Sequence, residues 1–576
     1  MGGIHLTVRT FGRPPRPRPG LGPADIVVLL GLVAVLYIAA QVATGAPAAV
    51  AGPEISLAPG ALPYYSALSV GRMLAAYMIA LVLSLAYGYA AAHNATAARG
   101  LLPLLDVLQS VPILSFLPVT LVSLSALLPD PLAVELASII LIVTSMIWNM
   151  AFSVYQSFST VPRDILEASS GFRLNAWLRF RLVELPFATQ PLIWNSILSW
   201  AGGWFFLMAA ESFTVGERDF RLPGLGSYLQ KAAETGDVAA AVRGIIALAL
   251  TIIVLDQIIW RPALAWSERF RLGTVEPEEA AHSWLYDILS RSWLVEQLVT
   301  RVWRPFLQRL DLALGRLAAQ PAGPPARARR RWPLLVLGGL LAVALAYVSF
   351  RAIALLAGLP LATWLAILAA AAVTLLRVIA ALAIAALWTV PAGILIGTSR
   401  RVAAAAQPVV QVVASIPATA LFPIIVVALL ALPGGLNVAA IILMLLGTQW
   451  YILFNVIAGT AAIPRELEYT ADVLGLSARL RWTTLLLPAL FPYLITGLIT
   501  ASGGAWNASI VAEYVVVAGQ TRQVRGIGAL ISQATANGDY TLLLAATLTL
   551  SVLVAAINQF VWRRLYAWAT ERFRFE

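Results

Sequence analysis

The chain has 576 residues, of which 60% are hydrophobic and 12% are charged, and its formal net charge is +11. An ordinary soluble protein carries about 25% charged residues, so this composition excludes a soluble enzyme. The positive charge does not indicate nucleic-acid binding, because the arginines stand at the ends of apolar blocks, where a positive-inside bias and anionic lipid headgroups account for them.

The residue types give little basis for metal or thiol chemistry. The chain contains no cysteine, which excludes a disulfide framework and a cysteine nucleophile. Its three histidines, His5, His93 and His282, lie far apart, whereas catalytic zinc usually needs closely spaced ligands. We therefore expect no metal site and interpret the histidines as polar residues near membrane ends.

The first half of the chain, over residues 25–271, contains six apolar blocks. An arginine- and proline-rich tail over residues 1–24 precedes them, and we interpret it as an uncleaved cytoplasmic tail because many spans follow. Each block is about long enough to cross the hydrocarbon core as a helix. The blocks fall at 25–43, 68–90, 101–128, 133–156, 188–210 and 241–261.

A joining segment over residues 272–332 follows the sixth block. Between Ser283 and Leu317 its apolar residues recur at three- and four-residue spacings, as on an amphipathic helix. Such a helix could lie on the inner leaflet or on a partner protein, or it could merely cover the distance between the two halves. The segment ends in a basic run over residues 327–331.

The second half, over residues 333–576, repeats the series and brings the total to twelve spans. Its blocks fall at 333–350, 366–396, 408–432, 436–458, 490–512 and 541–562. If the N-terminal arginines are cytoplasmic, most basic residues lie inside, as the positive-inside rule requires. The exceptions are Arg218, Arg221, Lys231, Arg351, Arg522 and Arg525.

The second half also repeats the first residue by residue. An offset of 302 places Trp148 on Trp450, Trp204 on Trp506 and Glu211 on Glu513, and an offset of 305 places Arg72 on Arg377. Because six spans is an even number, the repeats have parallel topology. The sequence therefore predicts an all-α membrane protein with about twelve transmembrane helices in two parallel six-helix repeats.

Each half has a long cytoplasmic loop after its fourth span, at about 157–187 and about 460–489. Pro162 and Pro464 suit a first helical turn, and Gly171 and Gly475 can supply the left-handed turn that ends a helix. Between them lie small residues, namely Ala168, Ser169 and Ser170 in one loop and Thr470 and Ala471 in the other. Two copies of such a helix favour a two-fold partner that presents the same groove twice, and a plain interfacial helix is the alternative.

These loops resemble the EAA motif of the membrane subunits of binding-protein-dependent ABC importers, which reads Glu-Ala-Ala, three residues, Gly, nine residues, then Ile-x-Leu-Pro. In the first loop Glu167 and Ala168 match, Ser169 replaces the second alanine and Arg173 stands at the glycine position. In the second loop Ala471 and Gly475 match, whereas Tyr469 stands at the glutamate position and Glu468 is one place earlier. The resemblance implies that Glu167, Ala168, Ser169, Gly171 and Arg173, with Glu468, Tyr469, Thr470, Ala471 and Gly475, couple the chain to ATPase subunits.

The resemblance narrows to the nitrate, sulfonate, taurine and bicarbonate class of these permeases. The segments from Ser110 to Pro118 and from Ser415 to Pro423 are similar to the third-span signature of that class. A usual member has one such half and works as a homodimer, so this chain looks like two permease halves fused, with a type I ABC importer-like fold.

What the resemblance implies is a permease subunit without catalysis of its own. Two ABC ATPase subunits would bind below, carrying ATP and magnesium, and a solute-binding protein would dock above. The only lysine, Lys231, does not stand in a phosphate-binding loop. The expected location is the bacterial inner membrane with both termini cytoplasmic, and the expected solute is a small anion such as nitrate, a sulfonate or bicarbonate.

Several residues are candidates for the translocation path. The third-span residues Ser110, Pro112, Pro118, Ser415, Pro417 and Pro423 could line or gate it, or could simply kink the helices. Glu211 and Glu513 could belong to the path or gate, or could pair with Arg218 or Arg525 at the interface. We expect Arg72 and Arg377 to snorkel to the outer interface, and the tryptophans of the repeat to be core or interfacial anchors.

A secondary carrier of the major-facilitator type is the main alternative, because it also has six plus six parallel spans. The repeated cytoplasmic motif lies between the fourth and fifth spans, and no clear carboxylate lies mid-span for proton coupling. Both observations favour the importer.

Overall fold

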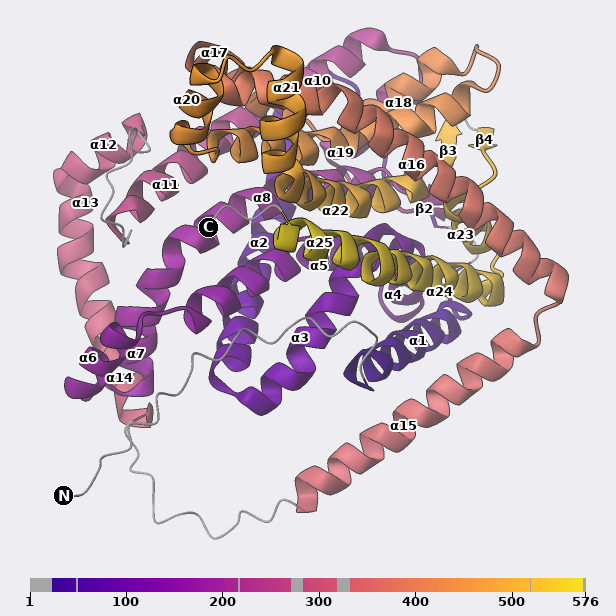
Figure 1. The fold of residues 1–576 in the computed structure, drawn as a ribbon. Helices are drawn as coiled ribbons and strands as arrows, with labels where there is room; N and C mark the ends of the chain where they lie inside the picture. Colours follow the sequence, from indigo (N-terminus) through magenta and orange to yellow (C-terminus); the bar gives the residue numbers. More distant parts are fainter. Residues whose placement is uncertain are drawn as a thin grey trace, which may run out of the picture.

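The computed structural model describes residues 23–47, 50–215, 218–270, 283–318, 332–517 and 520–572, and these are mostly helical (Figure 1). Within them, nine helices are long and apolar enough to cross a membrane, or up to ten if one bent pair counts as a single span. The tail before residue 23, the basic run at 327–331, His5 and His282 lie outside the described residues.

Every apolar block of the first half falls on a helix or a pair of helices. The segments that match the six predicted spans are α1 (Pro23–Ala43), α2 (Leu62–His93), α3 (Ala95–Ser110) with α4 (Leu117–Leu127), α5 (Asp130–Ser159), α8 (Leu185–Glu211) and α10 (Val238–Leu255). Shorter helices between and after them are α6 (Arg163–Gly171), α7 (Ala176–Arg179), α9 (Leu225–Glu234) and α11 (Arg261–Ser267).

The second half follows the same order after the joining segment. The joining segment forms α12 (Trp284–Arg291), α13 (Trp293–Leu298) and α14 (Arg304–Ala318), so the predicted amphipathic helix is confirmed, with a break at Ser292. The segments that match spans are α15 (Trp332–Ala357), α16 (Leu361–Thr398), α17 (Arg400–Ser415) with α18 (Ala418–Leu429), α19 (Gly435–Ala461), α22 (Leu487–Ala512) and α24 (Tyr540–Ile557). The shorter helices are α20 (Arg465–Val473), α21 (Ala478–Arg481), α23 (Ile527–Ala536) and α25 (Arg563–Arg572).

The third span of each half is broken beside a proline, Pro112 in one half and Pro417 in the other. The two segments of the first half, Ala95–Gln109 and Ile113–Leu127, are bent by 86°. The break falls at the residue before a proline, Val111 in one half and Ile416 in the other, and both have extended backbone. Helical backbone is disfavoured there because the proline ring clashes with the preceding residue.

The broken pairs nevertheless carry the chain back across the bundle. α2 and α5 run side by side in the same direction, because Arg72 contacts Glu135 near their starts and Tyr89 packs on Phe158 near their ends. Two parallel neighbours require that α3 and α4 return the chain between them. The second half repeats this with α16 and α19, which meet where Gly393 leaves room for Val456.

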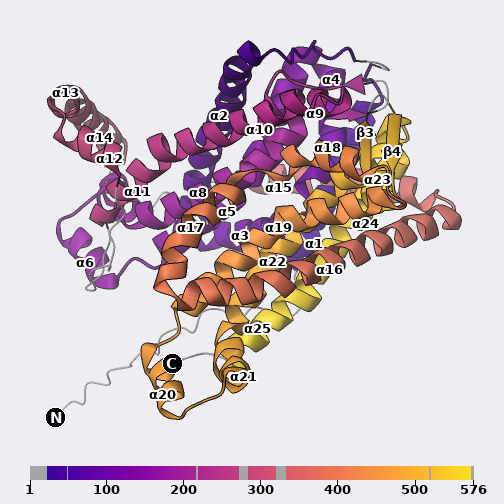
Figure 2. The same cartoon turned by 90° about the horizontal axis from the view of Figure 1, so that it is seen from above.

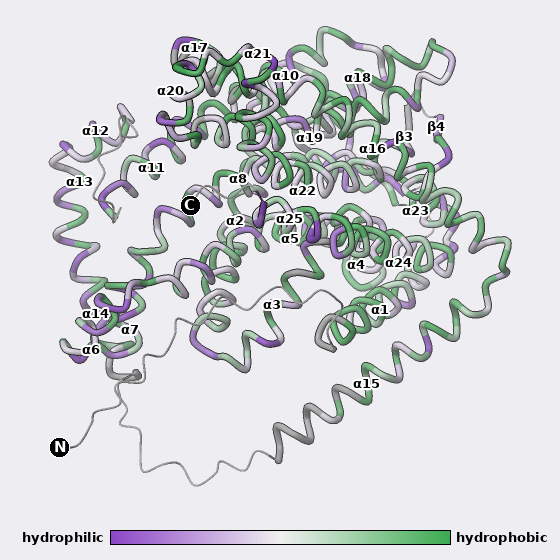
Figure 3. The backbone as a smooth tube through the Cα atoms, viewed as in Figure 1, coloured by the Kyte–Doolittle hydropathy of each residue, from purple (hydrophilic) through white to green (hydrophobic). Residues whose placement is uncertain are grey.

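Two short antiparallel hairpins follow the fifth spans and were not predicted from the sequence. β1 (Thr214–Val215) pairs with β2 (Arg218–Asp219), and β3 (Tyr514–Val517) pairs with β4 (Gln520–Gln523). Figure 2 shows β3 and β4 at the end of the bundle opposite α6, α20 and α21. Hydrophilic residues collect at these two ends, with apolar helices between them (Figure 3).

Candidate functional site

A buried ion-pair cluster holds the hairpin end of the fifth span in the first half. The Glu211 side chain is completely buried. Its carboxylate accepts hydrogen bonds from Ser69 Oγ at 2.7 Å, Arg72 Nη1 at 2.8 Å and the backbone N–H of Gly226 at 2.8 Å. Arg72 also donates to the Pro223 carbonyl at 2.8 Å, so the cluster joins α2, α8 and the start of α9.

The second half builds the same cluster from the equivalent positions. Glu513, also completely buried, accepts from Thr374 Oγ1 at 2.7 Å, Arg377 Nη1 at 2.7 Å and the N–H of Gly528 at 2.9 Å. Arg377 donates to the Arg525 carbonyl at 2.8 Å, as Arg72 does to that of Pro223. The repeat therefore preserves a set of interactions and not only a sequence.

The buried carboxylates approach the backbone of the two clusters so closely that only glycine fits there. A Cβ atom at Gly224 or Gly526 would overlap the carboxylate of Glu211 or Glu513. The repeated Gly-x-Gly pattern thus leaves room for a buried glutamate, and its second glycine supplies an N–H donor.

These clusters correct two expectations. Arg72 and Arg377 do not snorkel, since they are only 5% and 6% exposed. The buried glutamates pair with these two arginines and not with Arg218, which donates to the carbonyl of Pro47. An ionised group inside a bundle is retained when an opposite charge and further hydrogen bonds compensate its desolvation, and each half supplies both.

The two halves bond to each other through their broken third spans. In one direction the N–H of Leu114 donates to Asn507 Oδ1 of α22 at 3.2 Å. In the other direction Thr419 Oγ1 of α18 donates to the Phe205 carbonyl of α8 at 3.0 Å. Leu114 and Thr419 are equivalent in the repeat, as are Phe205 and Asn507, so each half inserts its kinked segment against the fifth span of the other.

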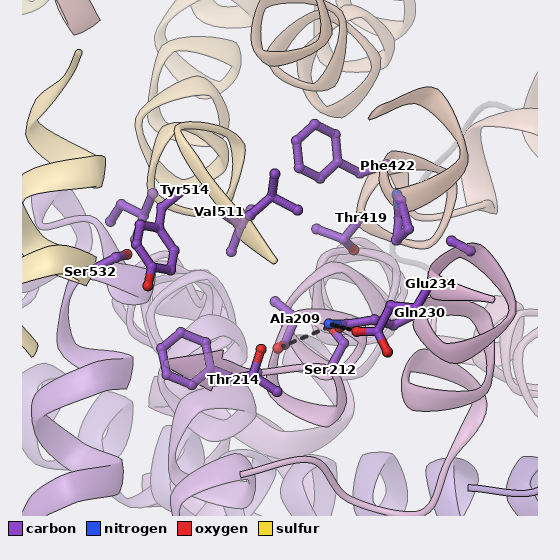
Figure 4. Close-up of a pocket in the computed structure, with 15 residues that line it drawn as sticks. Ala209, Ser212, Thr214, Gln230, Glu234, Thr419, Phe422, Val511, Tyr514 and Ser532 are labelled. Atoms are coloured by element: carbon purple, nitrogen blue, oxygen red, sulfur yellow. Dashed lines mark hydrogen bonds between the residues drawn. The ribbon is translucent and has the colours of Figure 1, made fainter. Parts of the chain in front are cut away.

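A cavity of about 80 Å³ lies between the two halves near the hairpin end (Figure 4). Its polar lining includes Ser212, Thr214, Gln230 and Glu234 from the first half and Thr419, Tyr514 and Ser532 from the second. Gln230 Nε2 donates to Glu234 Oε1 at 3.1 Å, as the dashed line in Figure 4 shows. Hydroxyl and amide groups from both halves can therefore contact a small solute here.

The predicted path residues lie in different places relative to this cavity. Pro423 lines it. Pro112, Pro118 and Pro417 are buried at or near the breaks, and Ser110 and Ser415 are the last residues of α3 and α17. Sequence reasoning missed the polar lining residues because isolated serines, threonines and glutamines form no motif, and only their position beside the fifth spans could have suggested them.

The helices of the two repeated loops are α6 and α20, and both lie at the end opposite the hairpins (Figures 1 and 2). Pro162 and Pro464 immediately precede them as N-caps. Ser169 and Ala471 are buried at equivalent positions, whereas Glu167, Ala168, Tyr469 and Thr470 are exposed. The side chain of Glu468 lies outside the described residues. Each helix thus packs Ser169 or Ala471 inward and exposes the residue before it, Ala168 or Thr470.

A left-handed residue ends both helices, and in the first loop it is not Gly171. Arg173 has φ 50° and Gly475 has φ 61°, whereas Gly171 is still helical. The same bond follows in both loops, from the Leu174 N–H to the Ser169 carbonyl and from the Leu476 N–H to the Ala471 carbonyl, each at 3.1 Å. The expectation for Gly171 was wrong because the surrounding bonds hold Arg173, at the motif's glycine position, in a conformation that costs about 1–2 kcal/mol.

The first loop is tied to the bundle by a buried glutamate. Glu184, 1% exposed, accepts from Arg179 Nε at 2.7 Å and contacts His93 Nε2 at 2.9 Å. The His93 ring stacks on Tyr89 of α2 at 4.1 Å between centroids. His93 is therefore part of this anchor and not simply a polar residue at a membrane end.

The joining segment holds the same loop from its other side. Trp177 Nε1 of α7 donates to Asp311 Oδ1 of α14 at 2.9 Å, and Arg181 pairs with the same carboxylate. Asn175 Nδ2 donates to the Gly315 carbonyl at 3.3 Å. The linker helix therefore does more than cover the distance between the halves. The equivalent positions of the second loop, Ser477, Arg479 and Thr483, are exposed.

Both halves of the chain match one known protein family. The family described as "Binding-protein-dependent transport system inner membrane component" matches residues 80–259 and again residues 389–574. The two matches together cover more than half of the chain. The chain belongs to this family.

Curated relatives of this family member are permeases for small solutes. The "Bicarbonate transport system permease protein CmpB" of Synechococcus elongatus is 32% identical over 33% of this chain and 64% of its own length. The "Nitrate import permease protein NrtB" of Leptolyngbya laminosa gives the same three figures. The chain therefore spans slightly less than two thirds of these relatives. The "Glycine betaine transport system permease protein OpuAB" of Bacillus subtilis is 26% identical over 62% of its length, and no solved structure matches.

The family match distinguishes a permease of binding-protein-dependent transport from a major-facilitator carrier. Two matches in one chain confirm the fused halves, and the family is one of binding-protein-dependent transport and not of major-facilitator carriers. It is a family of transport permeases and not of enzymes. Within the described residues, no three potential metal ligands gather.

Proposed function

We propose that this chain forms the transmembrane path of an ABC importer, with both permease halves in one polypeptide. The observation that carries the proposal is the pair of equivalent helices, α6 and α20, at one end of a bundle whose halves interlock (Figures 1 and 2). A membrane component with two such helices presents two similar sites to a two-fold partner.

The exposed side chains of these helices suit protein contacts. Phe172 is 80% exposed at the end of α6, and Leu474, its equivalent after α20, is 68% exposed. Tyr469 and Val473 on α20 are 71% and 68% exposed. Apolar groups on an otherwise hydrophilic surface mark an interaction site, and we assign α6 and α20 to one ABC ATPase subunit each. ATP and magnesium would be bound on those subunits.

The opposite end of the bundle would receive a solute-binding protein. The hairpins β1–β2 and β3–β4 lie there, next to the cavity between the halves. In this arrangement the α6 end and both termini are cytoplasmic. Closure of the ATPase pair would move α6 and α20 as rigid bodies and alter the contacts between the halves that surround the cavity.

The solute that we propose is a small anion of the bicarbonate or nitrate kind. The names of the relatives support this class, and the hydroxyl and amide groups of the cavity can donate hydrogen bonds to an oxyanion. The carboxylate of Glu234 lies 3.6 Å from Arg221, which reduces its repulsion of an anion.

The first experiment is purification of the tagged chain from its native membrane in mild detergent, with quantitative mass spectrometry of what accompanies it. We expect a P-loop ATPase at about two copies per chain, as one site on each of two equivalent helices requires. Phe172→Asp combined with Leu474→Asp should abolish co-purification of the ATPase, and Gln520→Asp at the hairpin end should leave it unchanged. A preparation without any ATPase, under conditions that preserve other membrane complexes, would contradict the proposal.

A further inference from the structure

The linker helices α12, α13 and α14 carry an apolar face that the described chain leaves uncovered. A π-helical turn, Val299–Trp303, joins α13 to α14. Leu298 of α13, Val302 of this turn and Phe306 of α14 recur at four-residue spacing and are 60%, 57% and 54% exposed. Trp293 and Trp303 are 66% and 55% exposed. An exposed apolar face of this kind marks a surface that contacts a membrane or another protein.

The opposite face of the same helices is polar and already has a partner. Arg301, Arg304, Gln308 and Asp311 follow one another at spacings of three and four residues, which places them on one side of a helix. Asp311 receives the Trp177 bond from the first cytoplasmic loop. The helix is therefore attached to the protein by its polar side, and its apolar side remains available.

The position of the segment indicates what covers that side. α12 is held at the end of α11 by a bond from Arg269 Nη2 to the Tyr286 hydroxyl at 2.6 Å. In both views the linker helices lie at the α6 end of the bundle and run across the direction of α24 (Figures 1 and 2). A helix in this position lies roughly parallel to the membrane plane, near the level at which α11 leaves the bundle.

The lipid-facing surface of the neighbouring span has the same character. On α10, which leads directly into α11, Val242, Ile246 and Leu250 are 49%, 52% and 56% exposed. These side chains belong to a membrane span and face acyl chains. The uncovered face of the linker helices has the same apolar character, and lipid is the occupant that the fold already requires on the adjoining span.

We propose that α12, α13 and α14 form an interfacial helix that lies in the headgroup region of the leaflet at the α6 end, with its apolar face in the acyl chains, and fastens the first cytoplasmic loop to the membrane through Asp311. Tryptophans at the boundary and arginines beside them suit this depth. Arg291, Arg301, Arg304 and Arg309 would attract anionic headgroups. The assignment of this leaflet to the cytoplasmic side rests on the proposed function. The contact of the helices with lipid does not depend on that function.

The absence of cysteine makes the test direct, because a single introduced cysteine is the only labelling site. The full chain would be reconstituted in nanodiscs of phosphatidylcholine and phosphatidylglycerol, with a spin label at Val302→Cys or Phe306→Cys on the apolar face, or at Arg304→Cys or Gln308→Cys on the polar face. Collisions with oxygen report lipid, and collisions with a water-soluble nickel chelate report water. Ile246→Cys and Gln520→Cys serve as references for lipid and for water.

We expect the ratio of oxygen to nickel accessibility at 302 and 306 to approach that at 246 and to exceed that at 304 and 308 several-fold. Nickel accessibility at 302 and 306 equal to that at 520 would overturn the proposal, because the face would then lie in water. Low accessibility to both reagents would also overturn it, because protein would then cover the face. Neither result would bear on ATPase binding, so the two proposals can fail separately.

Discussion

The first repeated loop closes on Glu184, which is buried between Arg179 and His93, whereas the second repeated loop carries Leu486 at the equivalent position. Only the first is also bonded to the linker helix, through Trp177 and Asp311. In the second, the ion pair between Arg481 and Asp472, at 2.7 Å, is largely exposed. The two loops thus share a backbone turn but differ in how firmly they are held.

The hairpin ends of the two halves behave in the opposite way. Around Glu211 and Glu513 every principal donor is repeated, and the main difference is that Arg72 also contacts Glu135 where Arg377 contacts Asn437. A buried charge tolerates no loss of a partner, whereas a solvent-exposed loop can change its contacts at little cost. The comparison predicts that matched substitutions have similarly large effects at the hairpin end, reduced in the first half by the second carboxylate on Arg72, and unequal effects in the loops.

The largest effect should follow removal of a buried glutamate. Glu513→Ala leaves the buried Arg377 without a carboxylate partner, whereas Glu211→Ala leaves Arg72 paired only with the partly exposed Glu135. We expect the free energy of unfolding to fall by about 3–5 kcal/mol at Glu513 and by somewhat less at Glu211. Chemical unfolding in detergent micelles measures this change in the free energy of unfolding. Glu135→Gln is the control, because its side chain is 38% exposed and a partly exposed pair contributes about 0–1 kcal/mol. A larger loss at Glu211 than at Glu513 would contradict this ranking, because Arg72 keeps a second carboxylate and Arg377 does not.

A smaller effect, confined to one loop, should follow Glu184→Gln. Hydrogen bonds to a charged group contribute about 1.5–3 kcal/mol, and here they involve Arg179 and His93. We expect faster amide hydrogen exchange in α6 and α7 and unchanged exchange in α20. Asp472→Asn in the second loop removes a pair whose carboxylate is 64% exposed, so its effect should be below about 1 kcal/mol. Equal changes in both loops would show that the anchor is not specific to the first.

The two loop glycines should respond with opposite signs to alanine. Gly475→Ala forces a Cβ atom into left-handed backbone and should destabilise the loop by about 1–2 kcal/mol. Gly171→Ala falls in a helix with open space around the added carbon and should stabilise it by up to about 1 kcal/mol. Thermal unfolding of the paired variants is the measurement, and a loss of stability at Gly171 would contradict its place in an uncrowded helical turn.

The smallest effect should come from Asp311→Asn. This change weakens the bonds to Trp177 and Arg181 but leaves α14 helical, so we expect a loss of about 0.5–1.5 kcal/mol. Hydrogen exchange should rise across residues 175–182 and remain unchanged in α21. Unaltered exchange in the first loop would mean that the linker helix does not stabilise it.

Periodicity and repetition were sufficient to predict most of the architecture. The apolar blocks identified helices at all twelve positions, and the aligned repeat identified Glu211 with Glu513 and Arg72 with Arg377 as equivalent. The loop motif located α6 and α20. What failed was local: the proline at 112 predicts a kink, but its 86° bend could not be obtained from composition.

The sequence also could not predict which arginines pair with Glu211 and Glu513. Arg218 and Arg525 stand closer to the glutamates along the chain, yet Arg72 and Arg377, some 140 residues away, are the partners. Sequence distance does not report which helices lie side by side. The motif comparison likewise noted Arg173 at a glycine position, but only the backbone bonds around it show that it keeps the left-handed turn.

The sequence by itself determined that this is a helical membrane protein of two parallel repeats with a paired loop motif, because hydrophobic length and internal similarity are properties of the chain alone. Tertiary structure decided which charges neutralise one another inside the bundle, how the kinked spans interlock the halves, and that the linker helix holds one loop and not the other. These are matters of packing between distant segments, where burial removes water as a partner and leaves each polar group to be satisfied by whichever helix lies beside it.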